Sequence, residues 1–273
     1  MKNIEDAVVR MAEIRQAISD DWETFHKIDI EIFPEDAMRE DSFSKRVEDD
    51  GFFILELDNE MIGYLLVQRY GKDEGYVARI GVVEEHRGKG FGKLLMKHGL
   101  YWFRKQGNIK AVHLQADLNE AALGLYKTTG FKKVGTTWHY FVPFDSVEPK
   151  GEYSCHEIQE GEIKTVVNIF PSTPPEQIRK FLSDEDVHVL VLKNKDGHIK
   201  GFARFSPKFP GCFPFEMTSA DCFDDFVMGL KKYSLPEFDY VRTTFTNIPE
   251  LADICENRNY KMHHKLHKMT LKL

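Results

Sequence analysis

The chain has 273 residues, 42% of them hydrophobic, and a formal net charge of −7. This length suits two domains, and the apolar content is enough to bury a core in each. The acidic balance argues against a nucleic-acid partner, because attraction to phosphate requires a basic face. No apolar stretch approaches the length that spans a bilayer, so we expect no membrane partner.

The first residues of the chain lack the apolar core of a signal peptide, and no two cysteines have the spacing of a zinc or redox motif. We therefore expect free thiols in a cytoplasmic protein. The cysteines all lie in the second half of the chain, at Cys155, Cys212, Cys222 and Cys255.

The first third of the chain begins with a predicted strand and two helices. Residues 11–18 are typical of a strand, and Ser19 or Asp20 can cap a helix that ends near Ile32. Asp41 opens a second, shorter helix.

Three strands come next. Residues 52–57 and 61–69 predict two strands joined by the hairpin turn Asp58-Asn59-Glu60. Residues 76–83 form an apolar run that predicts a buried fourth strand.

A glycine loop follows the fourth strand. Gly88, Gly90 and Gly92 stand at alternate positions, beside a predicted helix that begins near Phe91. Glycines let the backbone approach a ligand closely, and the exposed amides of a helix N-terminus attract anions. Full positive charges surround the loop, at Arg87, Lys89 and Lys93. We interpret the loop as a pyrophosphate site.

Two common nucleotide motifs do not fit this loop. A P-loop requires Lys followed by Ser or Thr, whereas Lys93 is followed by Leu94, and a dinucleotide fingerprint requires glycine at position 93. The pattern Arg87-x-x-Gly90-x-Gly92 instead resembles the Arg/Gln-x-x-Gly-x-Gly/Ala loop of the GNAT superfamily of N-acetyltransferases. In that family the loop grips the pyrophosphate of coenzyme A.

A second motif lies at the distance that the same family predicts. After a predicted strand at residues 111–116, the sequence from Asn119 to Phe131 is similar to the family's Asn…Ala…Leu-Tyr-x-x-x-Gly-Phe helix. Gly130 fits the left-handed residue that ends such a helix. Together the two motifs resemble a GNAT domain over residues 10–144.

The resemblance implies a fold and a reaction. The fold class is α/β (α+β), with a mixed central sheet flanked by helices, as in the GNAT acyl-CoA N-acyltransferase fold. The reaction is transfer of an acetyl group from acetyl-coenzyme A to a primary amine, by direct attack in a ternary complex. The acceptor is a small-molecule amine or a peptide amino group, and we expect a monomer or a homodimer.

The element order recurs after a polar linker at residues 145–152. Strands predicted at 187–192 and 199–205 parallel those at 52–69, and Asn259 stands where Gly130 stands in the first half. Cys255 replaces Tyr126, and no glycine loop precedes the helix predicted at residues 223–232. We expect a GNAT domain at 1–146 and a degenerate GNAT-like domain at 151–273, with an unrelated α/β domain as the alternative.

The resemblance also implies roles for particular residues. The pantetheine arm lies along the fourth strand, so the backbone of Val82 and Val83 would bind it and the Val82 amide would meet the thioester oxygen. Tyr126 would protonate the leaving thiolate, since a phenol stays protonated at neutral pH. The implied cofactor-binding set is Val82, Val83, Arg87, Gly88, Lys89, Gly90, Phe91, Gly92, Lys93, Asn119 and Tyr126.

The general base is left open. Many GNAT relatives use a carboxylate on the fourth strand, whose interior here contains none. Glu74 at the strand edge, Asp117 and His139 are candidates, and a water chain is equally compatible. Arg79 is unusual inside a strand, and we expect it to pair with an acidic core residue or to face an acceptor carboxylate.

No metal site is expected. His263, Lys265 and His267 share one face of the last predicted strand, without a third ligand at suitable spacing. Three rival functions remain: use of another acyl-coenzyme A, a coenzyme A sensor without turnover, and a protein or peptide N-acetyltransferase with an open groove.

Overall fold

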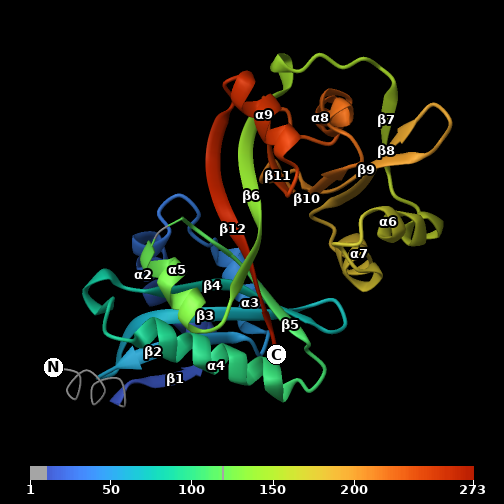
Figure 1. Ribbon diagram of the computed structural model, residues 1–273. Helices are drawn as coiled ribbons and strands as arrows, with labels where there is room; N and C mark the ends of the chain where they lie inside the picture. Colours follow the sequence, from blue (N-terminus) through green and yellow to red (C-terminus); the bar gives the residue numbers. More distant parts are fainter. Residues whose placement is uncertain (1–10, 119) are drawn as a thin grey trace. The chain divides into compact units, whose positions relative to one another are not determined.

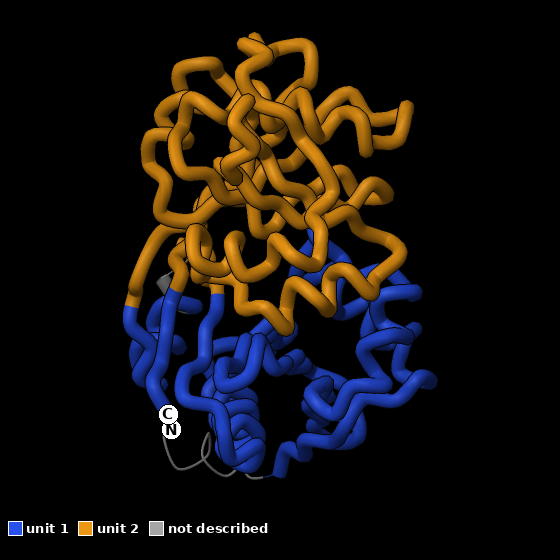
Figure 2. Tube along the Cα trace, turned by 90° about the vertical axis from the view of Figure 1, so that its right-hand side faces the viewer, with its two compact units in different colours: residues 1–114, 119–132, 269–273 blue, residues 115–118, 133–268 orange. Residues whose placement is uncertain are grey.

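The computed structural model describes residues 11–118 and 120–273. They form two compact units, and each combines strands with flanking helices. The described part of unit 1 is residues 11–114, 120–132 and 269–273, and unit 2 is residues 115–118 and 133–268. Figure 2 draws unit 1 in blue and unit 2 in orange.

Unit 1 follows the predicted order of elements. They are β1 (Glu13–Gln16), α2 (Trp22–Ile32), α3 (Glu40–Val47), β2 (Phe52–Leu57), β3 (Glu60–Tyr70), β4 (Glu74–Val82), α4 (Phe91–Lys105), β5 (Ala111–Ala116) and α5 (Glu120–Thr128). The strand order is β1-β2-β3-β4-β5 (Figure 1). The strands are antiparallel up to β4, and β4 runs parallel to β5.

An aromatic cluster fixes α2 and α3 on the sheet. Phe25 of α2 and Phe43 of α3 have ring centroids 4.9 Å apart, and Phe25 also contacts Phe52 of β2 and Tyr64 of β3. All four side chains are buried. Large rings bury more apolar area than other side chains, so this cluster is a main source of stability in unit 1.

Helix α4 begins at Phe91, as predicted, and contacts β3 and β4. Its buried face includes Leu95, Met96, Leu100 and Phe103. These apolar residues recur every three or four positions, and this spacing places their side chains on one side of the helix.

The start of unit 1 differs from the prediction in its capping residue. A 3-10 turn covers Ser19–Asp21, and Asp21, instead of Ser19 or Asp20, accepts the Ile18 N–H at 2.8 Å. Asp21 also receives two hydrogen bonds from Arg15, at 2.6 and 2.7 Å. The arginine holds the Asp21 carboxylate in place, which the local sequence does not reveal.

The remaining elements lie wholly or mostly in unit 2. They are β6 (Lys132–Pro143), β7 (Tyr153–Glu157), α6 (Ile163–Ile169), α7 (Pro175–Leu182), β8 (His188–Asn194), β9 (Ile199–Ser206), β10 (Gly211–Met217), α8 (Phe223–Lys231), β11 (Tyr240–Thr246), α9 (Pro249–Asn257) and β12 (Lys261–Lys272). The strand order is β12-β6-β11-β10-β9-β8-β7. Strand β10 runs parallel to β11 and antiparallel to β9.

The predicted linker is fixed within unit 2. Asp225 of α8 accepts hydrogen bonds from the N–H groups of Gly151 at 2.8 Å and Glu152 at 3.1 Å. The Tyr260 hydroxyl donates to the Ser146 carbonyl at 3.2 Å. These bonds explain why the compact unit includes the linker. The domains 1–146 and 151–273 were predicted from the recurring order of elements. A division of the chain into compact units does not test that recurrence, so the two domains stay a prediction.

The last strand contributes to both units. Residues of β12 up to Lys268 lie beside β6 in unit 2. Residues 269–273 belong to unit 1, where the end of the strand lies beside β5. Among the helices in the described ranges, none is long and apolar enough to cross a membrane.

Candidate active site

Strands β4 and β5 separate after a short parallel pairing. The register joins residues 74–76 to residues 111–113, and in the described part of the chain no pairing of β4 with β5 continues past Tyr76. Strand β4 runs on to Val82, with a register shift opposite Leu66 and Val67. Such a bulge increases the local twist of a strand. We call the unpaired side of β4 after Tyr76, which faces away from β3, the opening.

The backbone of Val82 faces this opening. Val83 donates its N–H to the Ile62 carbonyl on β3 at 3.0 Å. In an antiparallel ladder hydrogen-bonded pairs alternate with non-hydrogen-bonded pairs, so the adjacent pair Gly63–Val82 directs its N–H groups away from each other. The Val82 amide is therefore directed to the side of β5, where a thioester oxygen could reach it.

The backbone of Val83 is already used within the protein. Its N–H is bonded to Ile62, and its carbonyl accepts the His86 N–H at 3.0 Å. The Val82 carbonyl accepts a hydrogen bond from Arg87 Nε at 2.9 Å. Of the two valines implied by the resemblance, Val82 thus has the freer amide. Binding of a cofactor by either valine stays a prediction.

The loop after β4 has the geometry of an anion site. Gly88 and Gly90 have φ of +75° and +95°, a region that favours glycine, and Gly90 is the N-cap residue of α4. No side chain caps this helix, and its first turn contains no acidic residue. The first amides of α4 therefore have no partner within their own helix, and the helix dipole adds partial positive charge there.

Two lysines flank this N-terminus. Lys89 and Lys93 are exposed, and within the described ranges neither forms an ion pair. Phe91 is buried and anchors the first turn of α4 on the sheet. The residues present fit a diphosphate, because they combine free backbone amides with exposed cationic side chains.

Tyr126 lies on α5 in unit 1 and is 8% exposed. Burial raises the pKa of its phenol to about 12, so the group is protonated across the physiological range. The ring packs edge-on against Phe131, with centroids 6.2 Å apart. Asn119, the other residue predicted on this helix, lies outside the described residues.

A second phenol, Tyr76, was missed by the sequence analysis. It is the last residue of β4 that pairs with β5, so it marks the closed end of the opening. Burial raises its pKa, and Tyr70 and Tyr126 contribute to the increase. Because a tyrosine inside a strand is typical of any sheet, the sequence gives no signal for this position.

An acidic pocket lies at the other end of β4. It has a volume of about 500 Å³ and is lined by Glu31, Val83, Glu84 and Glu85. Glu31 of α2 accepts the Glu84 N–H at 3.0 Å. The sequence identified residues 84–85 only as a turn, and nothing in the local pattern joined them to α2.

None of the residues predicted as the general base lies on the second half of β4. Glu74 begins β4, eight residues before Val82, which corresponds to about 26 Å of extended strand. Its carboxylate is 3.4 Å from His113 Nε2. Asp117 is exposed after β5, and His139 lies on β6 in unit 2. The assignment of Glu74 as the base stays a prediction, with no support from its position.

The prediction that Arg79 pairs with an acidic core residue is confirmed. Its partner is Asp29 of α2, whose side chain is fully buried. Asp29 also accepts hydrogen bonds from the Tyr64 hydroxyl and the Met38 N–H. Arg79 thus has a structural role, because it joins β4, the strand that carries Val82, to α2.

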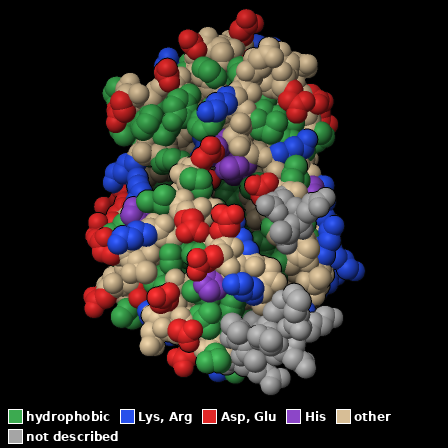
Figure 3. All heavy atoms as spheres, turned by 90° about the vertical axis from the view of Figure 1, so that its left-hand side faces the viewer, with side chains coloured by type: hydrophobic (Ala, Val, Ile, Leu, Met, Phe, Trp, Pro, Cys, Tyr) green, Lys and Arg blue, Asp and Glu red, His purple; other side chains and the backbone are tan. Residues whose placement is uncertain are grey.

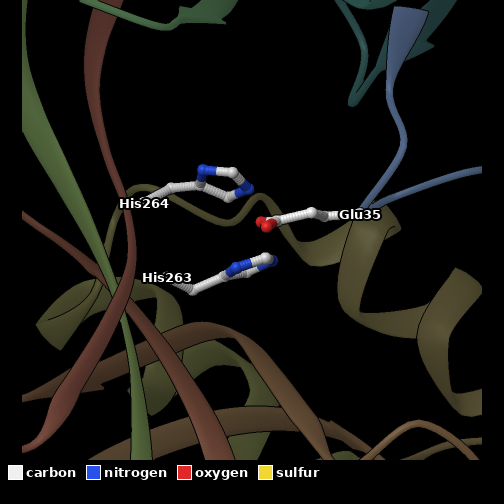
Figure 4. Close-up of side chains that lie close together, drawn as sticks. All are labelled: Glu35, His263 and His264. Atoms are coloured by element: carbon white, nitrogen blue, oxygen red, sulfur yellow. The ribbon is translucent and has the colours of Figure 1, made fainter. Parts of the chain in front are cut away.

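Three histidines lie together in unit 2. His263 and His264 are consecutive residues of β12 whose ring centroids are 3.9 Å apart (Figure 4). The ring of His139 on β6 is 5.6 Å from that of His264. The sequence analysis grouped His263 with Lys265 and His267 instead. The expected absence of a metal site stays a prediction.

Acidic and basic side chains lie intermixed on the face shown in Figure 3. A nucleic-acid interface instead gathers Lys and Arg on one face. The expectation of no nucleic-acid partner also stays a prediction.

Comparison with known proteins agrees with this geometry. Residues 11–131 match the model of the Acetyltransferase (GNAT) family. An "N-alpha-acetyltransferase" of Sulfurisphaera tokodaii is 30% identical over 102 residues, which cover 33% of this chain and 61% of the relative. The chain therefore spans less than two thirds of this curated relative.

Solved structures match the fold of both halves. A GCN5-related N-acetyltransferase from Sphaerobacter thermophilus has a TM-score of 0.73 at 14% identity, over 96% of each chain. A tandem GNAT protein from the clavulanic acid biosynthesis pathway has a TM-score of 0.63 at 12% identity, over 96% of this chain and 98% of that one. The predicted fold, including its second GNAT-like part, is confirmed. The match to the model of the acetyltransferase (GNAT) family and the glycine loop both lie within residues 11–131, so this part of the chain carries the similarity to that family.

Proposed function

We propose that unit 1 transfers an acetyl group from acetyl-coenzyme A to a primary amine. The observation that carries this proposal is the opening beside β4, which ends at the uncapped N-terminus of α4. The amides of residues 90–93, together with Lys89 and Lys93, would hold the diphosphate. The Val82 amide would stabilise the negative charge that develops on the thioester oxygen, an effect of about 2.7–4 kcal/mol in comparable sites.

The chemical step needs no covalent enzyme intermediate. The neutral amine attacks the thioester carbon, a C–N bond forms, and the C–S bond breaks. Tyr126 gives its proton to the departing thiolate, and the attacking nitrogen, which becomes the amide nitrogen, loses a proton to solvent or to a nearby carboxylate. The phenolate of Tyr126 then regains a proton from solvent. The raised pKa of Tyr126 suits this role, because the phenol carries its proton at every pH where the amine reacts.

We further propose that the preferred acceptor carries a second positive charge. The pocket lined by Glu31, Glu84 and Glu85 supports this, because three carboxylates at one end of β4 favour cations. The relative from Sulfurisphaera tokodaii is named an N-alpha-acetyltransferase, so a peptide amino terminus is the second candidate acceptor.

Thiol release measured with a chromogenic disulfide tests the reaction. The purified chain is given acetyl-coenzyme A and a panel that contains a diamine, a monoamine of equal length and a peptide with a free amino terminus. Release with any amine supports the transferase. Binding of acetyl-coenzyme A without release for any member would instead favour a sensor.

The charge of the acceptor is tested by the double variant Glu31→Gln, Glu84→Gln. We expect it to raise KM for the diamine by about tenfold, the effect of roughly 1.4 kcal/mol, and to leave KM for the monoamine unchanged. An equal change for both amines contradicts the proposed charge preference and leaves the transferase itself intact.

We also propose that residues 151–273 do not bind coenzyme A. No glycine loop separates β10 from α8, and the first turn of α8 contains Asp224 and Asp225. Arg258 donates to Asp224 at 2.5 and 2.9 Å, so this helix start is neutralised internally. Calorimetry is expected to detect a single bound coenzyme A per chain. Two equivalent sites would contradict this part of the proposal.

A further inference from the structure

The end of β12 packs on the residue that ends the Tyr126 helix. A Cβ atom placed on Gly130 would lie 3.1 Å from Cδ1 of Leu271, so the leucine side chain contacts the glycine closely. Gly130 has φ of +96° and occupies the left-handed position after α5. Both residues belong to unit 1.

The turn at Gly130 is joined directly to Tyr126. The Phe131 N–H donates to the Tyr126 carbonyl at 3.0 Å, and the Gly130 N–H donates to the Lys127 carbonyl at 3.1 Å. These two bonds form a Schellman motif. The Thr129 N–H and Oγ1 also donate to the Tyr126 carbonyl, at 3.2 and 3.0 Å. A displacement of Gly130 is therefore transmitted to Tyr126 through the hydrogen bonds of its two neighbours, Thr129 and Phe131, and through the ring of Phe131.

The same strand end is attached to β5. The Leu273 N–H donates to the Lys110 carbonyl at 3.0 Å, and Thr270 Oγ1 lies 2.8 Å from His113 Nδ1. Met269 is 1% exposed. An unpaired strand edge exposes N–H and C=O groups that can pair with another chain. Through these contacts residues 269–273 cover that side of β5.

We propose that residues 269–273 are a positioning strand for the candidate active site, and that Leu271 is a positioning residue that holds Tyr126 in place through Gly130. The inference rests on the proposed acetyl transfer. It extends the site to a segment far beyond the residues 11–131 that match the family. The step that it serves is proton donation from the Tyr126 hydroxyl to the thiolate.

Leu271→Ala and Leu271→Met in the full chain test the proposal. The alanine variant loses the contact with Gly130, and we expect kcat to fall about tenfold, since small displacements of catalytic groups cost this much or more. The dissociation constant of acetyl-coenzyme A is expected to stay within about twofold, because the glycine loop does not depend on Leu271. The methionine variant keeps the reach of the side chain and is expected to restore kcat. An unchanged kcat in Leu271→Ala overturns the proposal, and so does an equal loss in both variants.

Hydrogen exchange gives a readout that does not need turnover. In Leu271→Ala we expect faster exchange of the Gly130 and Phe131 amides and no change in α4. Leu182→Ala is the matched control, because Leu182 is an exposed leucine at the end of α7. Unchanged exchange at Gly130 contradicts the positioning role. If the unmodified chain releases no thiol with any amine, the proposed function fails, and exchange still decides the role of Leu271.

A chain that ends at Lys268 is the stronger perturbation. We expect it to lose exchange protection along β5 and to lose acetyl transfer, while α6 to α9 of unit 2 stay protected. A chain of this length with the kcat of the full protein overturns the proposal.

Discussion

Arg79 on β4 donates from Nη2 to Oδ1 of Asp29 on α2, at 2.7 Å. Asp29 is fully buried and Arg79 nearly so, with side-chain exposures of 0% and 17%. Arg79 also donates to the Asp36 carbonyl at 2.9 Å and stacks over the ring of Phe33 at 4.4 Å. These contacts fix α2 and the loop after it to the strand that leads to Val82.

Asp29→Asn is therefore expected to destabilise the protein by about 3 kcal/mol, because it leaves a buried guanidinium without its counter-charge. The free energy of unfolding from urea titration measures this change. The control is Asp41→Asn, which removes an ion pair with Arg39 whose side chains are both 58% exposed. That change is expected to cost less than about 1 kcal/mol. Equal losses in the two variants would contradict a structural role for Arg79.

Tyr126→Phe is expected to lower kcat by at least about tenfold and to leave the affinity for coenzyme A nearly unchanged, because only the proton donor is removed. Its pKa of about 12 also makes a prediction about pH. The phenol keeps its proton as pH rises to 10, so ionisation of Tyr126 should cause no fall of kcat below that pH. Steady-state kinetics from pH 7 to 10 checks both points. Unchanged turnover in the variant removes the assignment.

Gly90→Ala is expected to weaken coenzyme A binding by about tenfold. Its φ of +95° costs a residue with a Cβ roughly 1–2 kcal/mol, so the loop leaves the geometry that presents its amides. Gly124→Ala in α5 is the matched control, since a Cβ there meets no atom within 4 Å. Calorimetric titration with coenzyme A compares them. Comparable affinities would show that the loop does not hold the diphosphate.

Glu216→Gln tests a partly buried carboxylate of unit 2. Burial raises the pKa of Glu216 above 4.5, although Ser172 and Lys268 oppose the increase. Between 4.5 and this raised pKa the native state binds more protons than the unfolded state, so stability falls as pH rises through that window. The glutamine variant has no such proton to lose. Its stability relative to the original chain should increase from pH 4 to pH 7, as urea titration can show, and a constant difference would contradict this account.

Local features of both units were predictable because they depend on neighbouring residues. The hairpin turn at Asp58 and Asn59 has φ of 53° and 65°, and Gly130 and Asn259 take the left-handed conformation that the sequence predicts. Strand β5 covers Ala111–Ala116, as expected. Each of these assignments follows from the conformational preferences of one or two residues.

The site was only partly predictable, because its remaining parts depend on contacts between distant residues. Glu31 and Glu84 meet across 53 positions, and Asp29 and Arg79 across 50. The residues that join β5 to the end of β12 are even farther apart in the sequence. No local pattern specifies which strand covers the edge of another. For the same reason, the sequence did not indicate that the Val83 amide is bonded to β3.

The contrast between the first turns of α4 and α8 has a consequence for engineering. The first turn of α4 has no acidic residue and no side-chain cap, whereas in α8 Asp224 forms an ion pair with Arg258. Inserting glycines after β10 would therefore not be enough to give α8 an anion site. Asp224 and Asp225 would still repel an anion at its first turn, so an engineered site requires their replacement as well.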